Sequence, residues 1–117
     1  MAGGITIYHN PECGTSRTVL ASIEAAGFQP EVVLYLEAGW TRDGLTRLLE
    51  RALANPRDWL RVRNSPAEEL GLTAPDTADE AIFEAMLVHP VLVDRPVVET
   101  PKGVKLCRPA ETVLELL

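Results

Sequence analysis

The chain has 117 residues, of which 46% are hydrophobic and 24% charged, and its formal net charge is −6 at pH 7. This composition is typical of a globular protein, and the length suits one domain, residues 1–117, with a single core. The acidic balance argues against nucleic acid as a partner, because phosphate binding needs an excess of lysine and arginine. No apolar run approaches the roughly 20 residues of a membrane span. The two cysteines are far apart in the sequence, and the N-terminal residues 1–4 show no signal-peptide features. Both observations indicate a reducing, cytoplasmic setting.

The first third of the chain predicts a strand, a helix and a second strand. Residues 5–8 form a short apolar strand, and residues 16–26 form a helix that Gly27 is suited to end. Residues 30–35 are β-branched and mostly apolar, which is typical of a parallel strand covered on both faces. We therefore expect a right-handed β–α–β unit.

Three helices are predicted in the middle of the chain. Thr41 caps the first, whose apolar residues repeat at helical spacing. Asn55 and Pro56 begin a shorter helix, and a capping box over residues 77–80 begins the third. His89 is expected to cap the end of that third helix. The expected buried positions are Leu45, Leu48, Leu49 and Ala52 in the first helix, Trp59 and Leu60 in the second, and Ile82, Phe83, Met86 and Leu87 in the third.

The last third changes to a strand pattern. Residues 91–98 are strand-like with a break at 94–96, residues 100–103 suit a hairpin turn, and residues 104–107 form the returning strand. Pro109 begins a terminal helix whose inward residues are expected to be Val113, Leu114 and Leu117. The whole order predicts an α/β, thioredoxin-like fold: a mixed four-stranded sheet with a helical insert between its β–α–β and β–β–α halves.

Cys13 is the strongest candidate for chemistry. It lies between the first predicted strand and the first predicted helix, where free backbone N–H groups and the helix dipole favour a thiolate. Ser16 stands where many redox proteins carry a second cysteine. Cys13 can therefore attack a substrate but cannot close a local disulfide, so an external thiol must resolve its intermediate.

The neighbours of Cys13 have two interpretations each. Ser16 could cap the helix or hydrogen-bond the thiolate, and capping is favoured. His9 and Asn10 could donate near the sulfur or simply hold the turn, and a protonated His9 would favour the thiolate. We take His9 and Ser16 as the residues that would activate Cys13. A Cys-x5-Arg phosphatase loop is excluded, because position 19 is a valine.

Two arginines occur beside prolines near strand ends. Arg95 precedes Pro96, and a thioredoxin-like fold places such a proline, often cis, against the active cysteine. Arg108 follows Cys107 at a strand-to-helix junction. If both arginines project toward the Cys13 turn, they form an anion cradle.

Cys107 could resolve an intermediate on Cys13, but its place at the end of an apolar strand favours a core position. We expect no metal site and no bound cofactor.

One segment resembles a known active site. Tyr-His-Asn-Pro-x-Cys-Gly-Thr-Ser-Arg, from Tyr8 to Arg17, closely resembles the active-site segment of the glutaredoxin-linked arsenate reductases. Further blocks match in family order over essentially the whole chain. These blocks are Leu34-Tyr35-Leu36-Glu37, Glu69-Leu70-Gly71-Leu72, His89-Pro90, Arg95-Pro96-Val97-Val98 and Leu106-Cys107-Arg108-Pro109.

The resemblance implies reduction of arsenate to arsenite, with Cys13 attacking the arsenic and His9 associated with its activation. Glutathione would be the co-substrate and glutaredoxin the partner that reduces the mixed intermediate. Three arginines would hold the oxyanion. They fall on Arg95, Arg108 and, by ungapped spacing, Arg61.

Several alternatives stay open at this point. Arg63 is close enough to Arg61 in sequence to take the place of the third arginine. The chain could be a glutathione-dependent oxidoreductase of another substrate. It could also be a non-enzymatic regulator that binds RNA polymerase, a branch of the same superfamily that uses a Cys-x-x-Cys switch. Ser16 argues against that switch.

Overall fold

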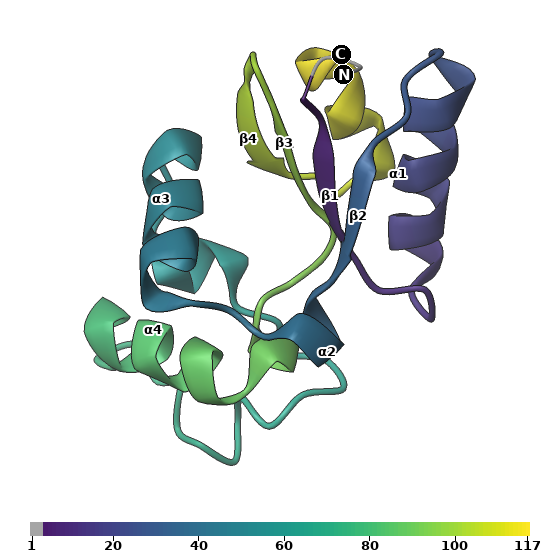
Figure 1. The fold of residues 1–117 in the computed structure, drawn as a ribbon. Helices are drawn as coiled ribbons and strands as arrows, with labels where there is room; N and C mark the ends of the chain where they lie inside the picture. The colour runs from purple at the N-terminus through teal and green to yellow at the C-terminus, as the bar shows by residue number, and fades with distance from the viewer. Residues whose placement is uncertain (1–3) are drawn as a thin grey trace. The chain divides into compact units, whose positions relative to one another are not determined.

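The computed structural model describes residues 4–117, so the first three residues of the predicted start lie outside the described part. The described chain divides into two compact units. Among the described residues, the sheet unit comprises residues 4–38 and Arg95–Leu117, and the helical unit comprises Gly39–Asp94. The elements of the sheet unit are β1 (Thr6–His9), α1 (Gly14–Ala25), β2 (Glu31–Leu34), α2 (Tyr35–Ala38), β3 (Val97–Thr100), β4 (Gly103–Leu106) and the 3-10 helix η3 (Ala110–Leu116) (Figure 1). Those of the helical unit are α3 (Arg42–Ala52), η1 (Pro56–Trp59), α4 (Asp79–Val88) and η2 (Pro90–Leu92).

The described strands form one mixed sheet in the order β2-β1-β3-β4. β1 runs parallel to β2, whereas β3 is antiparallel to both β1 and β4. The register pairs His9 with Leu34 on one side of β1 and Tyr8 with Val97 on the other. The predicted thioredoxin-like fold, with a helical segment between its two halves, is confirmed. The single-domain assignment stays a prediction.

One face of the sheet carries the core of the sheet unit. α1 and η3 pack against each other on this face, and apolar side chains of β1, β3, α1 and η3 meet between them. The buried residues of this cluster are Ile5, Ile7, Val19, Ile23, Val98, Cys107, Val113 and Leu116. The cluster packs β1 against α1, the two elements that flank Cys13.

Two elements of the first third differ from the prediction. α1 begins at Gly14 instead of residue 16, because Cys13 already has the extended backbone of an N-cap (φ −98°, ψ 122°). β2 is parallel to β1 as predicted, but it is an edge strand and Val32 is 42% exposed. The expected cover on both faces is therefore wrong. The β-branched residues of β2 reflect strand propensity more than burial.

The strand predicted over residues 91–98 is much shorter. Pro90 occupies the first turn of η2, which takes up Val91 and Leu92, and Val93 makes only an isolated bridge to Leu60. β3 begins after Pro96, in keeping with a residue that has no N–H to donate to a sheet. The peptide bonds before Pro96 and Pro109 are both cis. The hairpin turn between β3 and β4 is where the sequence places it.

The terminal helix is a 3-10 helix, which changes its buried face. Val113 and Leu116 are buried, whereas Leu114 is 63% exposed. Residues three apart share one face in a 3-10 helix, which explains the pairing of Val113 with Leu116. The prediction that Leu114 faces inward is wrong because it assumed α-helical spacing.

Six of the ten expected buried residues of the helical unit are buried, and the other four are half-buried: Ala52, Leu60, Phe83 and Leu87. The helices themselves follow the prediction with two exceptions. Thr41 caps α3 by accepting the Gly44 backbone N–H at 3.0 Å, as expected. α4, however, has Ala78 as its N-cap, and the Thr77 hydroxyl donates instead to the Gly71 carbonyl oxygen at 2.8 Å. The capping box predicted over residues 77–80 is therefore absent. The second exception is the short helix at Pro56, which is present but has 3-10 geometry.

The remaining features of the helices agree with the sequence or were not anticipated. His89 ends α4, as predicted, and its backbone N–H donates to the Ala85 carbonyl oxygen. The short helix α2 was not predicted, and its first residue, Tyr35, is fully buried. Within the described residues, no helix has both the length and the apolarity needed to cross a membrane.

Candidate active site

Cys13 sits at the junction that the sequence indicates, between the end of β1 and the first turn of α1. Its backbone N–H donates to the Asn10 carbonyl oxygen at 3.0 Å, and its own carbonyl oxygen accepts the Arg17 N–H at 3.0 Å. The first contact closes the turn, and the second belongs to the first turn of the helix. The side chain is half-buried and its thiol is free. The thiol is thus both held in place and accessible.

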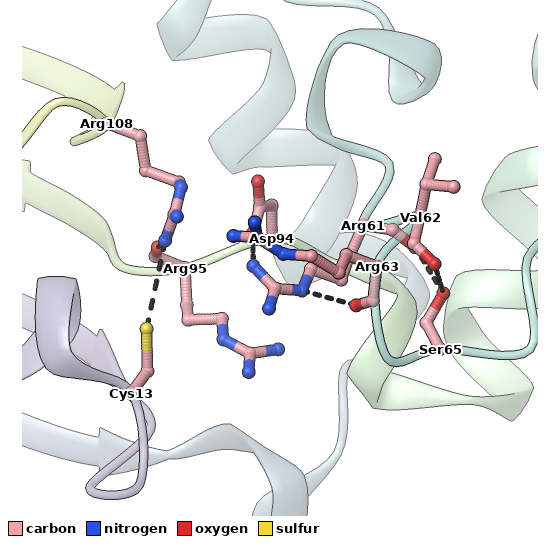
Figure 2. Close-up of polar contacts among 8 residues, drawn as sticks. All are labelled: Cys13, Arg61, Val62, Arg63, Ser65, Asp94, Arg95 and Arg108. Atoms are coloured by element: carbon pink, nitrogen blue, oxygen red, sulfur yellow. Dashed lines mark hydrogen bonds and ion pairs between the residues drawn. The ribbon is translucent and has the colours of Figure 1, made fainter.

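Two predicted arginines converge on the Cys13 sulfur. Arg108 Nη1 lies 3.7 Å from Cys13 Sγ and also donates to the Arg95 carbonyl oxygen at 3.0 Å (Figure 2). Arg95 is 8% exposed, and its side chain also hydrogen-bonds the Cys13 sulfur. Arg95 lies two residues before β3 and Arg108 two residues after β4, so the β3–β4 hairpin presents both of them. Both arginines therefore project toward the Cys13 turn, as the sequence predicts, and the binding of an anion between them stays a prediction.

These contacts make Cys13 unusually acidic. Partial burial raises the pKa of the thiol, but the Ser16 backbone N–H, the Arg95 and Arg108 hydrogen bonds and the charge of Arg95 all lower it. The net effect is a pKa of about 7. A thiolate is the nucleophilic form of cysteine, so a substantial fraction of Cys13 is reactive at neutral pH.

Ser16 has neither of the side-chain roles that the sequence suggests. Because Cys13 is the N-cap of α1, Ser16 lies within the helix and the predicted capping role is wrong. Its hydroxyl contacts His9 Nδ1 at 2.6 Å and accepts the Asn10 backbone N–H at 3.1 Å. The contact of Ser16 with the sulfur comes from its backbone N–H. The Ser16 side chain therefore links the start of the turn, at His9 and Asn10, to the first turn of α1.

His9 and Asn10 hold this turn from the other side. Both are buried, and the Asn10 side-chain oxygen accepts the Glu12 N–H at 2.9 Å. Burial and the positive charge of Arg17 lower the pKa of His9. The neutral imidazole is therefore favoured at neutral pH. Of the two roles open to His9, the structure favours holding the turn over acting as a cation.

Cys107 belongs to the core. It is fully buried in the cluster between the sheet and its helices, and its sulfur donates weakly to the Lys105 carbonyl oxygen at 3.7 Å. Burial raises the pKa of this thiol to about 12. The core position favoured by the sequence is confirmed. A thiol with these properties is unsuited to resolve an intermediate on Cys13.

Arg61 and Arg63 lie in the helical unit and differ in burial. Arg61 is 7% exposed, its Nη1 pairs with Asp94 Oδ1 at 3.1 Å, and its Nε donates to the Arg63 carbonyl oxygen at 2.8 Å (Figure 2). Arg63 is exposed. Asp94 orients the Arg61 side chain, and sequence reasoning gave this aspartate no role. The sequence feature that could have indicated this role is the position of Asp94 directly before the Arg95-Pro96 pair.

No cluster of three or more metal-ligating side chains occurs among residues 4–117. The groups gathered at the cradle are cationic donors and a thiol, which suit an oxyanion better than a metal cation.

Comparison with known proteins identifies relatives over nearly the full chain. The ArsC family model matches residues 8–116. The chain is 54% identical over 113 residues to the arsenate reductase ArsI2 of Synechocystis sp., covering 97% of this chain and 81% of that one. It is 49% identical over 113 residues to an arsenate reductase of Escherichia coli, covering 97% and 80%. Among solved structures, an arsenate reductase from Vibrio cholerae superposes with a TM-score of 0.92 at 38% identity, covering 100% of both chains.

Proposed function

The chain belongs to the ArsC family, and from this premise we propose that it reduces arsenate to arsenite with Cys13 as the nucleophile. The observation that carries the proposal is the Cys13 sulfur, with its pKa of about 7 and its hydrogen bond to Arg108 at 3.7 Å. A partly ionised thiol beside guanidinium groups suits attack on the central atom of a small oxyanion.

In the first step the Cys13 thiolate attacks the arsenic atom. A sulfur–arsenic bond forms, one arsenic–oxygen bond breaks, and the oxygen leaves as water after it is protonated. The product is a thiolated arsenic(V) species on Cys13. Arg95 and Arg108 neutralise the charge on the remaining oxygens, an effect that reaches a few kcal/mol per donor in a closed site.

An external thiol is needed to complete the reduction, because Ser16 and the buried Cys107 supply no resolving partner. Glutathione displaces a second oxygen of the arsenic as water and leaves its sulfur bound there. A glutaredoxin thiol then attacks that sulfur, so that a disulfide forms and two electrons pass to the arsenic. The arsenic(III) product is released by hydrolysis as arsenite, which restores Cys13. Glutathione chemistry of this kind belongs in a reducing cytoplasm.

Arg61 is our choice for the third oxyanion-binding arginine. Its guanidinium is buried and oriented by Asp94, whereas Arg63 is exposed. A pre-oriented arginine loses less conformational freedom when it binds an anion, which favours Arg61 over Arg63.

The proposal is tested by arsenate-dependent oxidation of NADPH in the presence of glutathione, glutaredoxin and glutathione reductase. We expect turnover by the wild-type chain and none by the Cys13→Ser variant, because serine does not supply a thiolate. Absence of turnover above the Cys13→Ser background would refute arsenate reduction. Turnover that does not depend on glutathione or glutaredoxin would refute the proposed electron donors while leaving Cys13 as the nucleophile.

A further inference from the structure

Arg61 and Asp94 lie on two short segments of the helical unit that the backbone joins. An isolated antiparallel bridge links Leu60 of one segment to Val93 of the other. Beside it, the Arg61 N–H donates to the Leu92 carbonyl oxygen at 2.7 Å, and the Asp94 N–H donates to a carbonyl oxygen of the opposite segment at 2.8 Å. Successive side chains of an extended segment project to opposite faces, so the residues that follow the two bridged ones project to the same face. The backbone therefore brings the Arg61 and Asp94 side chains together.

The Arg61 guanidinium is held by two contacts within the helical unit. Its Nη1 pairs with Asp94 Oδ1 at 3.1 Å, and its Nε donates to the Arg63 carbonyl oxygen at 2.8 Å (Figure 2). The side chains of the ion pair are 9% and 19% exposed. A guanidinium with so little access to water is unfavourable without a counter-charge. Asp94 therefore allows Arg61 to stay both charged and buried.

These two contacts leave hydrogen-bond donors of Arg61 unused. Nη2 is the guanidinium nitrogen for which residues 4–117 offer no acceptor. A guanidinium is planar, so the contacts that fix Nε and Nη1 also fix the direction of Nη2. Nη2 is therefore a charged donor that is oriented before any ligand arrives, and such donors suit the oxygens of an oxyanion.

The chain itself connects Asp94 to the residues around Cys13. Asp94 is the last residue of the helical unit and is bonded directly to Arg95, where the sheet unit resumes. The Arg95 side chain hydrogen-bonds the Cys13 sulfur. The carboxylate that orients Arg61 and one arginine beside the thiol thus belong to adjacent residues.

We propose that Asp94 is a positioning residue, which holds Arg61 so that its Nη2 binds an oxygen of arsenate. This inference rests on the proposed role of Arg61 in oxyanion binding. Asp94 acts through Arg61, because it reduces the conformational freedom that the arginine loses when it binds the anion. Loss of the carboxylate should therefore weaken arsenate binding and leave the Cys13 thiol unchanged.

Arsenate binding is measured by 1H–15N NMR of the arginine Nε–H groups in the Cys13→Ser background, which has no thiol to react with arsenate. Arg61→Ala identifies the Arg61 signal, and we expect arsenate to shift it. Asp94→Ala should raise the Kd for arsenate about ten-fold, the loss expected for one orienting contact to a charged group. Asp94→Asn keeps an acceptor in the same place, so its Kd should stay within about two-fold of the background.

Steady-state kinetics with Cys13 intact separate positioning from a purely structural role. Asp94→Ala should raise KM for arsenate about ten-fold and change kcat by less than about two-fold, because a contact of equal strength in the ground and transition states acts on KM. The midpoint of Cys13 alkylation should stay near pH 7, since the Cys13 pKa of about 7 has no contribution from Asp94. Asp76→Ala removes an exposed carboxylate of the same unit and is the matched control.

Circular dichroism verifies that each variant is folded. Asp94→Ser, whose hydroxyl is too short to reach Arg61, replaces Asp94→Ala if that variant does not fold. The proposal is wrong if arsenate does not shift the Arg61 signal, if the folded variant without the carboxylate keeps the Kd of the background, or if Asp94→Asn loses as much affinity as Asp94→Ala. Absence of arsenate turnover by the wild type, with the expected Kd values, would refute the proposed function and leave the positioning of Arg61 by Asp94 intact.

Discussion

Cys13 and Cys107 are both free thiols, yet their surroundings differ in burial and in charge. Cys13 is half-buried beside two guanidinium groups and a backbone N–H, and its pKa is about 7. Cys107 is enclosed by apolar side chains, and its pKa is raised to about 12. At the residue scale, the same functional group is therefore a partly ionised, accessible thiol in one place and a neutral core side chain in the other.

The first prediction concerns the pH dependence of this difference. The alkylation rate of Cys13 should rise with pH through a midpoint near 7 and level off above it, because only the thiolate reacts. Mass spectrometry after a short iodoacetamide pulse gives the rate for each cysteine. The Cys13→Ser variant, which retains Cys107, should stay unlabelled while folded. A Cys13 midpoint near that of an ordinary thiol, about 8.5, would contradict the electrostatic account.

The second prediction concerns Arg108. Arg108→Ala removes a donor from the Cys13 sulfur and from the proposed oxyanion cradle, so kcat/KM for arsenate should fall about 100-fold. Arg108→Lys keeps the charge without the forked geometry and should recover only part of the loss. Arg47→Ala, which changes an exposed arginine of α3, is the control. Unchanged kinetics in Arg108→Ala would show that the cradle is not part of the reaction.

At the scale of elements, serine and threonine side chains near predicted helix starts form hydrogen bonds with different kinds of partner in this chain. Thr41 caps α3 as its sequence pattern predicts. Thr77 and Ser16 occur in similar local patterns, but their hydroxyls bind Gly71 and His9 instead. A short polar side chain takes the best partner that the folded chain offers, and that partner is not always the adjacent helix end.

The third prediction concerns the end of α3. Leu53 ends this helix in the left-handed region (φ 55°, ψ 40°) with its side chain 95% exposed. An L-residue pays about 1–2 kcal/mol for this backbone, whereas glycine adopts it freely. Leu53→Gly should raise the free energy of unfolding in urea by about 0.5–1 kcal/mol, since the flexibility of glycine in the unfolded chain offsets part of the gain.

Ala52→Gly is the matched control for Leu53→Gly, because Ala52 is the last residue of α3 in right-handed helical geometry. Glycine there should lower the free energy of unfolding by about 0.5–1 kcal/mol. A decrease in stability for both variants would show that the left-handed backbone of Leu53 carries no strain that glycine relieves.

At the scale of the whole molecule, the candidate residues are shared between the two compact units. The sheet unit holds Cys13, Arg95 and Arg108, and the helical unit holds Arg61. Both tryptophans of the chain also lie in the helical unit, where the Trp40 side chain donates to the Pro90 carbonyl oxygen at 3.3 Å. Tryptophan fluorescence therefore reports on one unit, and labelling of Cys107 reports on the other.

The fourth prediction tests whether the chain is one domain. A single domain should unfold in one transition, so tryptophan fluorescence and Cys107 labelling should give the same urea midpoint in the Cys13→Ser background. Ile7→Ala, which removes a fully buried side chain from β1, should lower the free energy of unfolding by about 2–5 kcal/mol and move both midpoints together. Separate midpoints, or a shift of the Cys107 midpoint alone, would indicate two independent domains.

The sequence by itself determined the order of the four strands and of the helices α1, α3 and α4, the thioredoxin-like fold, the β3–β4 hairpin and the place of Cys13 between β1 and α1. These features follow from periodicity, turn residues and helix-end signals that act over a few residues. Only the tertiary structure decided the 3-10 geometry of the terminal helix, the partner of the Ser16 hydroxyl and the approach of Arg108 to Cys13. Those two residues are 95 positions apart. Their contact depends on the order and register of the strands, and no local pattern of residues encodes that geometry.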